Sequence, residues 1–143
     1  MADEEAFERQ ARACAALGSP FTARLCRMAA ARLGPSDPVG RTILEWPGDA
    51  SGGSDALPLR FTGALHALVL SGRDAALQAV YPPHDVSDDD LWKAITAAIS
   101  RHAPFILDRL TSAPQTNEIR RSAVLLPGFL TIAARFGLPL DLL

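Results

Sequence analysis

The sequence predicts an all-α fold, arranged as a single-domain irregular bundle of about six to eight helices. Three observations lead to this prediction. Apolar residues recur at every third or fourth position along most of the chain, which is the spacing of one helix face. Prolines and glycines interrupt this pattern where helices would begin and end. No stretch combines alternating polarity with the β-branched or aromatic enrichment of strands.

The first two helices are predicted to form a tight hairpin. An apolar stripe runs through residues 7–17, and Gly18 is placed to end that helix in a left-handed conformation. Ser19 and Pro20 then supply an N-cap followed by proline at the first helical position. The second stripe continues to Gly34. Two helices joined by so short a turn should pack side by side.

A short helix and a long apolar helix are predicted next. Asp37 and Pro38 repeat the signal of cap and proline, and Pro47 ends the short helix. Residues 47–55 (PGDASGGSD) are predicted to be a flexible loop inside one domain, residues 1–143, because neither side alone can build a core. The apolar helix begins at Ser54 or Asp55 and ends at Ser71-Gly72.

Three further helical segments follow. A brief helix is predicted from Asp74 to Tyr81, where two prolines stop it. Residues 87–90 (SDDD) combine a serine cap with negative charge at a helix N-terminus, which favours a new helix there. Pro104 is expected to interrupt this helix near His102, so that a second leg continues toward residue 114.

The end of the chain is predicted to hold a kinked apolar helix. It begins near Thr116 or Asn117 and reaches Phe136, with a kink at Pro127. Because its middle is almost wholly apolar, this helix is expected to be central and surrounded. Residues 138–143 are apolar up to the last position and resemble a strand or helix entering a core.

Composition and charge exclude several classes of protein. The 143 residues are 48% hydrophobic and 21% charged, which is ordinary for a globular chain and unlike a disordered one. The net charge of −2 gives no general attraction to nucleic acid. Arg24, Arg27 and Arg32 are interpreted as a solvated helix face rather than a phosphate-binding patch. We therefore expect no nucleic-acid partner.

The cysteines and the apolar runs predict a cytoplasmic location. Cys14 and Cys26 lie among small apolar neighbours, which suits buried free thiols in a reducing compartment better than a bridge or metal site. Residues 1–10 are acidic and lack the features of a signal peptide. The longest apolar run, residues 123–134, is too short to span a bilayer. No membrane partner is expected.

No motif assigns a catalytic residue, a metal or a cofactor. The histidines His66, His84 and His102 occur without a CxxC pair or an HExxH helix, so no zinc site is predicted. The sequence also lacks a GxSxG turn and the glycine-rich phosphate loops. His66 lies in the apolar helix, where its ring must find a partner. It is either a core histidine satisfied by a carbonyl or carboxylate, or a residue that faces a ligand.

One dense polar cluster precedes the last apolar helix. It contains Gln115, Asn117, Glu118 and Arg121. These residues could cap the helix and pair with one another at helical spacing. Alternatively, an amide, a carboxylate and a guanidinium at a helix N-terminus could hold a polar or anionic group. Together with His66, these four are the candidate ligand-binding residues.

Several segments resemble a known bacterial family. They are residues 7–17 (FERQARACAAL), 63–73 (GALHALVLSGR), Tyr81-Pro82 and 115–127 (QTNEIRRSAVLLP). They are similar to the N-terminal part of the domain of unknown function 2332 family. In longer members, the segment like residues 138–143 leads into a glycine-rich stretch similar to that of S-adenosylmethionine-dependent methyltransferases. The resemblance implies that this terminal segment is the first strand of a Rossmann-like half that this chain lacks.

Three functions are compatible with these features. The one we favour is an uncharacterised accessory or substrate-gripping module of a larger bacterial protein, with no catalysis of its own and an unknown small-molecule ligand. The second is a homodimeric interaction protein that hides its apolar terminus by self-association. The third is an enzyme, either complete in itself or part of a methyltransferase-like protein whose cofactor half is missing.

Overall fold

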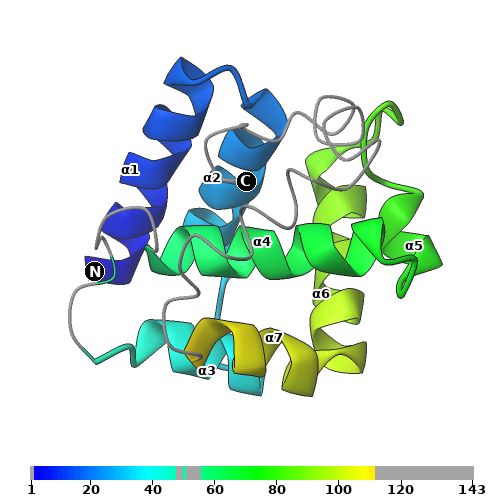
Figure 1. The fold of residues 1–143 in the computed structure, drawn as a ribbon. Coiled ribbons are helices and arrows are strands. Elements are labelled where there is room, and N and C mark those ends of the chain that lie inside the picture. The colour runs from blue at the N-terminus through cyan, green and yellow to red at the C-terminus, as the bar shows by residue number, and fades with distance from the viewer. Residues whose placement is uncertain (1, 48–49, 51–55, 112–143) are drawn as a thin grey trace, which may run out of the picture.

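The computed structural model of the chain describes residues 2–47, 50 and 56–111, most of which are helical (Figure 1). The helices of this part are α1 (Ala2–Ala16), α2 (Pro20–Arg32), α3 (Pro38–Leu44), α4 (Leu57–Leu70), α5 (Ala75–Gln78), α6 (Asp88–Arg101) and α7 (Ala103–Thr111). These ranges contain no strand. The predicted all-α class is therefore confirmed where the structure describes the chain.

The turn between α1 and α2 depends on Gly18. This residue has φ = +83°, a conformation that glycine adopts without the strain a side chain would cause. The Ser19 N–H donates to the Cys14 carbonyl at 2.8 Å, and the Gly18 N–H donates to the Ala15 carbonyl at 3.2 Å. These two bonds form a Schellman motif, which satisfies carbonyls left open at the end of α1. The predicted helical hairpin is confirmed, with the turn where the glycine placed it.

The start of α3 packs against the backbone that leaves α2. Asp37 caps α3, since its carboxylate accepts a 2.8 Å hydrogen bond from the Gly40 N–H. A β-carbon added at Gly40 would collide with the carbonyl of Gly34. Position 40 therefore needs glycine for close approach, whereas its φ is unremarkable. The helix ends at Leu44, before Pro47, which had been predicted to end it.

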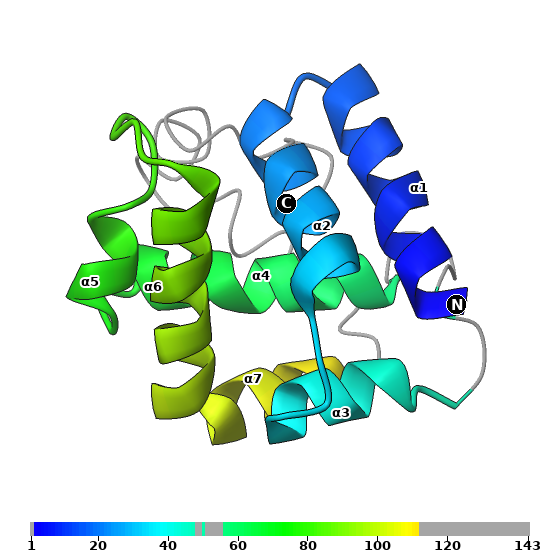
Figure 2. The ribbon, with the colours of Figure 1, turned by 180° about the vertical axis from the view of Figure 1, so that it is seen from behind.

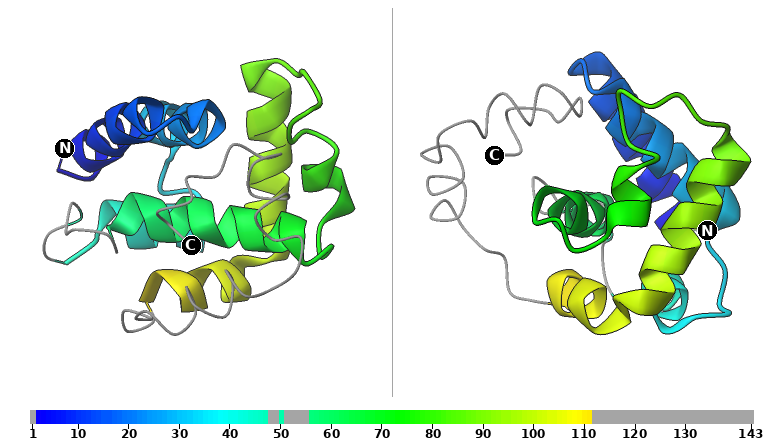
Figure 3. Two further views of the ribbon diagram at one scale, coloured as in Figure 1. Left: turned by 45° about the horizontal axis from the view of Figure 1, so that its top comes forward. Right: turned by 90° about the vertical axis from the view of Figure 1, so that its right-hand side faces the viewer.

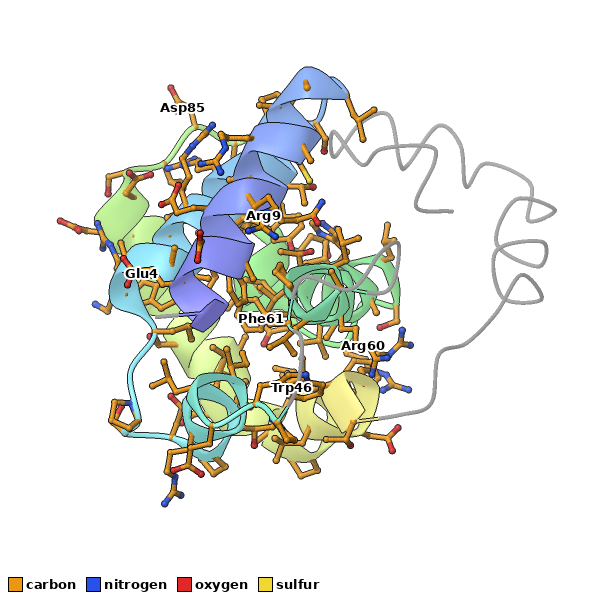
Figure 4. All side chains as sticks on the ribbon, turned by 90° about the vertical axis from the view of Figure 1, so that its left-hand side faces the viewer. Glu4, Arg9, Trp46, Arg60, Phe61 and Asp85 are labelled. Atoms are coloured by element: carbon orange, nitrogen blue, oxygen red, sulfur yellow. The ribbon has the colours of Figure 1, made fainter. Side chains whose placement is uncertain are left out.

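Helix α4 lies at the centre of the described part, and the other helices surround it (Figures 1 and 3). Its proline, Pro58, is tolerated because it falls in the first turn. Phe61 is fully buried, and its ring meets that of Phe7 on α1 edge to face, with centroids 5.9 Å apart. Figure 4 shows Phe61 among the side chains packed between α1 and α4. This apolar contact joins the hairpin to the centre of the bundle.

The remaining helices follow the predicted caps closely. Asp74 caps α5, and Ser87 caps α6 by accepting a 3.1 Å hydrogen bond from the Asp90 N–H. Helix α6 ends at Arg101, and α7 begins at Ala103, so the interruption predicted beside Pro104 is confirmed. Figure 2 shows α6 and α2 on the same side of α4.

The structure differs from the sequence prediction around Tyr81. Helix α5 ends at Gln78, whereas the predicted helix reached Tyr81. The N–H groups of Val80 and Tyr81 donate to carbonyls three residues back, at 3.1 Å each, so the chain tightens into turns before the two prolines. This tightening turns Tyr81 out of the helical path and into the core, where it is fully buried.

Two predicted segments lie wholly or mostly outside the described residues. Of the predicted loop 47–55, the structure describes only Pro47 and Ala50. The predicted kinked helix and the apolar end of the chain belong to residues 112–143, which are not described.

Candidate functional site

His66 is the candidate residue that the structure describes, and it lies at the centre of a buried hydrogen-bonded chain. The residue is 7% exposed, and its side chain projects from α4. The Nδ1 atom lies 3.0 Å from the Tyr81 hydroxyl oxygen, and Nε2 lies 3.3 Å from the Thr22 Oγ1 atom. The hydroxyl of Ser19 donates to Thr22 Oγ1 at 3.0 Å. The chain of contacts therefore links the start of α2, the middle of α4 and the turn after α5.

Aromatic rings enclose this polar chain. Tyr81 meets His66 edge to face, with centroids 5.7 Å apart, and meets Phe21 in the same manner at 4.6 Å. Such edge-to-face pairs stabilise more than the area they bury. The backbone carbonyl of Tyr81 also pairs with the Nδ1 atom of His84, at 2.9 Å. Tyr81 is thus held by its ring, its hydroxyl and its backbone.

Burial controls the electrostatics of this site. It lowers the pKa of His66 to about 3, because the surrounding core disfavours the charged imidazolium. Burial also raises the pKa of the Tyr81 hydroxyl well above its ordinary value. Both groups are therefore uncharged near neutral pH. The neutral imidazole carries one N–H, so it donates to one of its two hydroxyl partners and accepts from the other.

This arrangement can hold a proton in place but presents no ring nitrogen to a ligand. Both nitrogens of His66 face side chains of the protein itself. Of the two interpretations, a satisfied core histidine agrees with this geometry. The partners differ from those expected, since they are the hydroxyls of Thr22 and Tyr81 rather than a carbonyl or carboxylate.

The other four candidate residues lie outside the described part of the chain. They are Gln115, Asn117, Glu118 and Arg121, all within residues 112–143. They stay a prediction from the sequence.

Sequence reasoning missed the residues that hold His66. Thr22 carries no motif, and its role depends on how α2 crosses α4. Tyr81 had a weak signal, because Tyr81-Pro82 is one of the segments that resemble the bacterial family. Ser19 was predicted as a side-chain cap for α2, and this was wrong in detail. It occupies the N-cap position, but its side chain makes no capping bond and binds Thr22 instead.

A second buried polar cluster joins α5 to the end of α6. The Asp74 carboxylate is 2% exposed and accepts hydrogen bonds from the Arg101 Nη2 atom at 2.7 and 2.9 Å. It also accepts the Leu77 N–H at 2.9 Å and lies 3.1 Å from the His102 Nε2 atom. Burial alone would raise the pKa of Asp74, but the Leu77 N–H, Arg101 and His102 outweigh it, so that this pKa is lowered.

The arginines of α2 pair with acids at the start of α6. Arg24 donates to the Asp88 carboxylate at 2.7 Å and to the Val86 carbonyl at 2.8 Å, while Arg32 donates to Asp89 at 2.9 Å. These acids are the ones expected to favour the N-terminus of α6. This geometry agrees with the interpretation of Arg24 and Arg32 as part of a helix face rather than a phosphate site.

A shallow hollow opens between α1, α2 and α3. Its volume is about 240 Å³, and its lining is apolar apart from Glu4, with Phe7, Leu33 and Ile43 among the contributing residues. Ligand pockets for drug-sized molecules usually measure roughly 300–1,000 Å³. The hollow is smaller than this range.

The described part of the chain contains neither a candidate metal site nor a candidate membrane span. No group of three or more histidine, cysteine or acidic side chains within residues 2–47, 50 and 56–111 could hold a metal ion. Among the described helices, none has the length and apolar character needed to cross a membrane.

Comparison with known proteins identifies the family. Neither a curated protein nor a solved structure matches this chain. The model of the domain of unknown function 2332 family, described as an uncharacterized protein conserved in bacteria, matches residues 4–143. The match covers nearly the whole sequence and includes every segment on which the resemblance was based. The chain therefore belongs to this uncharacterised bacterial family.

Proposed function

We propose that this chain is a helical accessory module that grips a substrate or partner for a larger bacterial protein and carries out no catalysis of its own. The observation that supports this is the engagement of both ring nitrogens of His66 by Thr22 and Tyr81. A general base must reach the proton it abstracts and works best with a pKa near the operating pH. His66 has a pKa of about 3, and its nitrogens face the protein's own hydroxyls.

The grip itself is assigned to the polar cluster before the last predicted helix. Gln115, Asn117, Glu118 and Arg121 offer amide, carboxylate and guanidinium groups within a short stretch. Arginine and amide side chains of this kind bind anionic and polar groups. In this proposal His66 supports the scaffold, and these four residues contact the ligand.

The module is proposed to be a single domain that acts in the cytoplasm. Cys14 and Cys26 are both free and buried, which is usual for proteins of a reducing compartment.

Alanine substitution tests the scaffold role of His66. We expect His66→Ala to lower the midpoint of thermal unfolding by several degrees, because it leaves Thr22 and Tyr81 without their shared partner. Lys93→Ala is the control, since Lys93 is exposed on α6 and its loss should change the midpoint little. If His66→Ala abolished an activity of the protein without changing its midpoint, the enzyme interpretation would replace this one.

Two measurements separate the module from its alternatives. Adding S-adenosylmethionine should leave the midpoint of thermal unfolding unchanged. A ligand raises this midpoint only when it binds the folded protein, and the proposed module does not bind this cofactor. A clear increase would favour a methyltransferase-like protein. Light scattering that gives the mass of a stable dimer would favour the homodimeric interaction protein instead.

A further inference from the structure

Two arginines stack on one aromatic ring at the start of α7. The guanidinium carbon of Arg73, just after α4, lies 4.7 Å from the centroid of the Phe105 ring. The guanidinium carbon of Arg109, one turn after Phe105 on α7, lies 4.9 Å from the same centroid. Both arginines are exposed, whereas Phe105 is half-buried against the core. Because the faces of the ring are negative, Phe105 attracts both guanidiniums and holds two positive charges near each other.

Stacking leaves the hydrogen-bonding edges of both guanidiniums open. A stacked guanidinium uses its flat face, while its five N–H donors point outward in its plane. The side chains of Arg73 and Arg109 form no ion pair or hydrogen bond with another residue of the described part of the chain. Arg24, by contrast, is paired with Asp88. The two stacked arginines are therefore held in place by the ring without being neutralised there.

Arg101 adds a third guanidinium to this end of the bundle. Its Nη2 atom donates to both oxygens of the Asp74 carboxylate, and Asp74 follows Arg73 directly in the chain. These bonds hold Arg101 through one nitrogen, and its side chain stays 47% exposed. Residues 70–75 and 101–109, which contain all of these side chains, include three arginines and two aspartates. Positive charge therefore exceeds negative charge here, although the whole chain carries a net charge of −2.

The spacing of the stacked pair favours a ligand with two linked anionic groups. A guanidinium matches the oxygens of a phosphate with parallel hydrogen bonds. Like charges repel, so the two guanidiniums take separate places around the ring, yet their carbons are no farther apart than the sum of the two distances to its centroid. A diphosphate can place one phosphate against each guanidinium, whereas a single phosphate is too small to use both fully.

We propose that Arg73 and Arg109, held on the Phe105 ring, form a binding site for a small molecule that carries a diphosphate group, with Arg101 as a further donor. The sequence lacks the glycine-rich loops that hold phosphate through backbone amides, so side chains supply the donors at this site. The site uses none of the residues of the polar cluster to which the grip was assigned. It therefore stands or falls separately from the proposed function.

Isothermal titration calorimetry of the full chain with sodium diphosphate tests this proposal. The ionic strength is kept constant, because salt screens exposed charges. We expect one saturable site with a Kd of about 1 mM or tighter, as a few charge-assisted hydrogen bonds at an exposed site would give. Sodium citrate, which offers carboxylates in place of phosphates, is titrated in parallel and should bind more weakly.

Three variants and a matched control locate the bound diphosphate. Arg73→Gln and Arg109→Gln should each raise the Kd about tenfold, because each removes charge-assisted hydrogen bonds. Phe105→Leu should also raise the Kd, although it changes no charge, because both guanidiniums lose the ring that holds them. Arg12→Gln is the control, since Arg12 is exposed on α1 and its loss changes the net charge equally. It should leave the Kd nearly unchanged.

The natural chain gives a decisive outcome, even if a variant fails to fold. Absence of saturable binding up to about 10 mM diphosphate, tenfold above the expected Kd, would overturn the proposal. Citrate that binds as tightly as diphosphate would overturn the assignment of the ligand class. An equal rise in Kd for Arg12→Gln and Arg73→Gln would show attraction to charge in general. A rise for Arg121→Gln alone would move the binding to the polar cluster, which also contradicts the site on Phe105.

Discussion

Hydroxyl groups surround His66, whereas a guanidinium and an imidazole surround Asp74. Both residues are almost fully buried, at 7% and 3% exposure, and both connect elements that are distant in the sequence. At His66, burial suppresses the charge, and the pKa falls to about 3. At Asp74 the charge persists, because the Leu77 N–H, Arg101 and His102 favour the carboxylate more than burial disfavours it.

The difference shows that a buried titratable group can be accommodated either by losing its charge or by pairing it. The stability of the folded protein depends on pH differently in the two cases. His66 binds fewer protons folded than unfolded, so its contribution is present above its ordinary pKa of 6.5 and is lost as pH falls toward 3. Asp74 also has a lowered pKa, but from an ordinary value of 3.8. Its contribution is lost only in more acidic solution, as pH falls through the folded-state pKa.

The largest expected effect is the acid sensitivity due to His66. Between about pH 7 and pH 4, the folded protein should lose about 3 kcal/mol of stability through this residue, at about 1.4 kcal/mol for each pH unit. Urea unfolding of His66→Gln across the same range should show a flatter dependence. An unchanged slope in the variant would mean that the histidine is accessible enough to become charged in the folded state.

The next effect concerns the charged cluster, which consists of Asp74, Arg101 and His102. Asp74→Ala removes the α5 cap and the partner of Arg101, and should cost about 2–3 kcal/mol in denaturant unfolding at neutral pH. Arg101 is 47% exposed, so water moderates the loss of its partner. Asp74→Asn is the control, since it keeps an oxygen to accept the Leu77 N–H. It should cost less than Asp74→Ala, and equal losses would show that the capping bond contributes nothing.

A smaller effect is expected at the hydroxyl that holds His66. Tyr81→Phe keeps the ring contacts with Phe21 and removes the partner of the His66 Nδ1 atom. The loss in free energy of unfolding should be about 1–2 kcal/mol, the range for one buried hydrogen bond. A variant as stable as the natural protein would show that this hydrogen bond between Tyr81 and His66 does not contribute to the stability of the fold.

The smallest effect is expected at the surface pair between α2 and α6. Arg32 donates to Asp89, which is 89% exposed, so solvent weakens the attraction. Arg32→Ala should change the free energy of unfolding by less than about 0.5 kcal/mol. A loss as large as that of Asp74→Ala would contradict the view that burial, rather than ion pairing itself, makes the charged cluster strong.

The fold of the described part was largely predictable, because its signals are local. Gly18, Asp37 and Ser87 mark helix boundaries through bonds that reach only a few residues along the chain. The length of the brief helix was predicted wrongly, because the i to i+3 bonds that tighten the chain before Tyr81 leave no clear pattern in the sequence. His66 could be selected as an unusual polar residue on an apolar helix, but its partners could not.

For the described part of the chain, the sequence by itself determined which segments are helical and where most of them begin and end. It also determined that His66 must find a hydrogen-bond partner. Only the tertiary structure decided that Thr22 and Tyr81 are those partners and that Asp74 meets Arg101. The physical reason is the separation along the chain over which each kind of interaction acts. Caps and turns act on neighbouring residues, whereas these contacts depend on how whole helices cross, which the packing of the complete core determines.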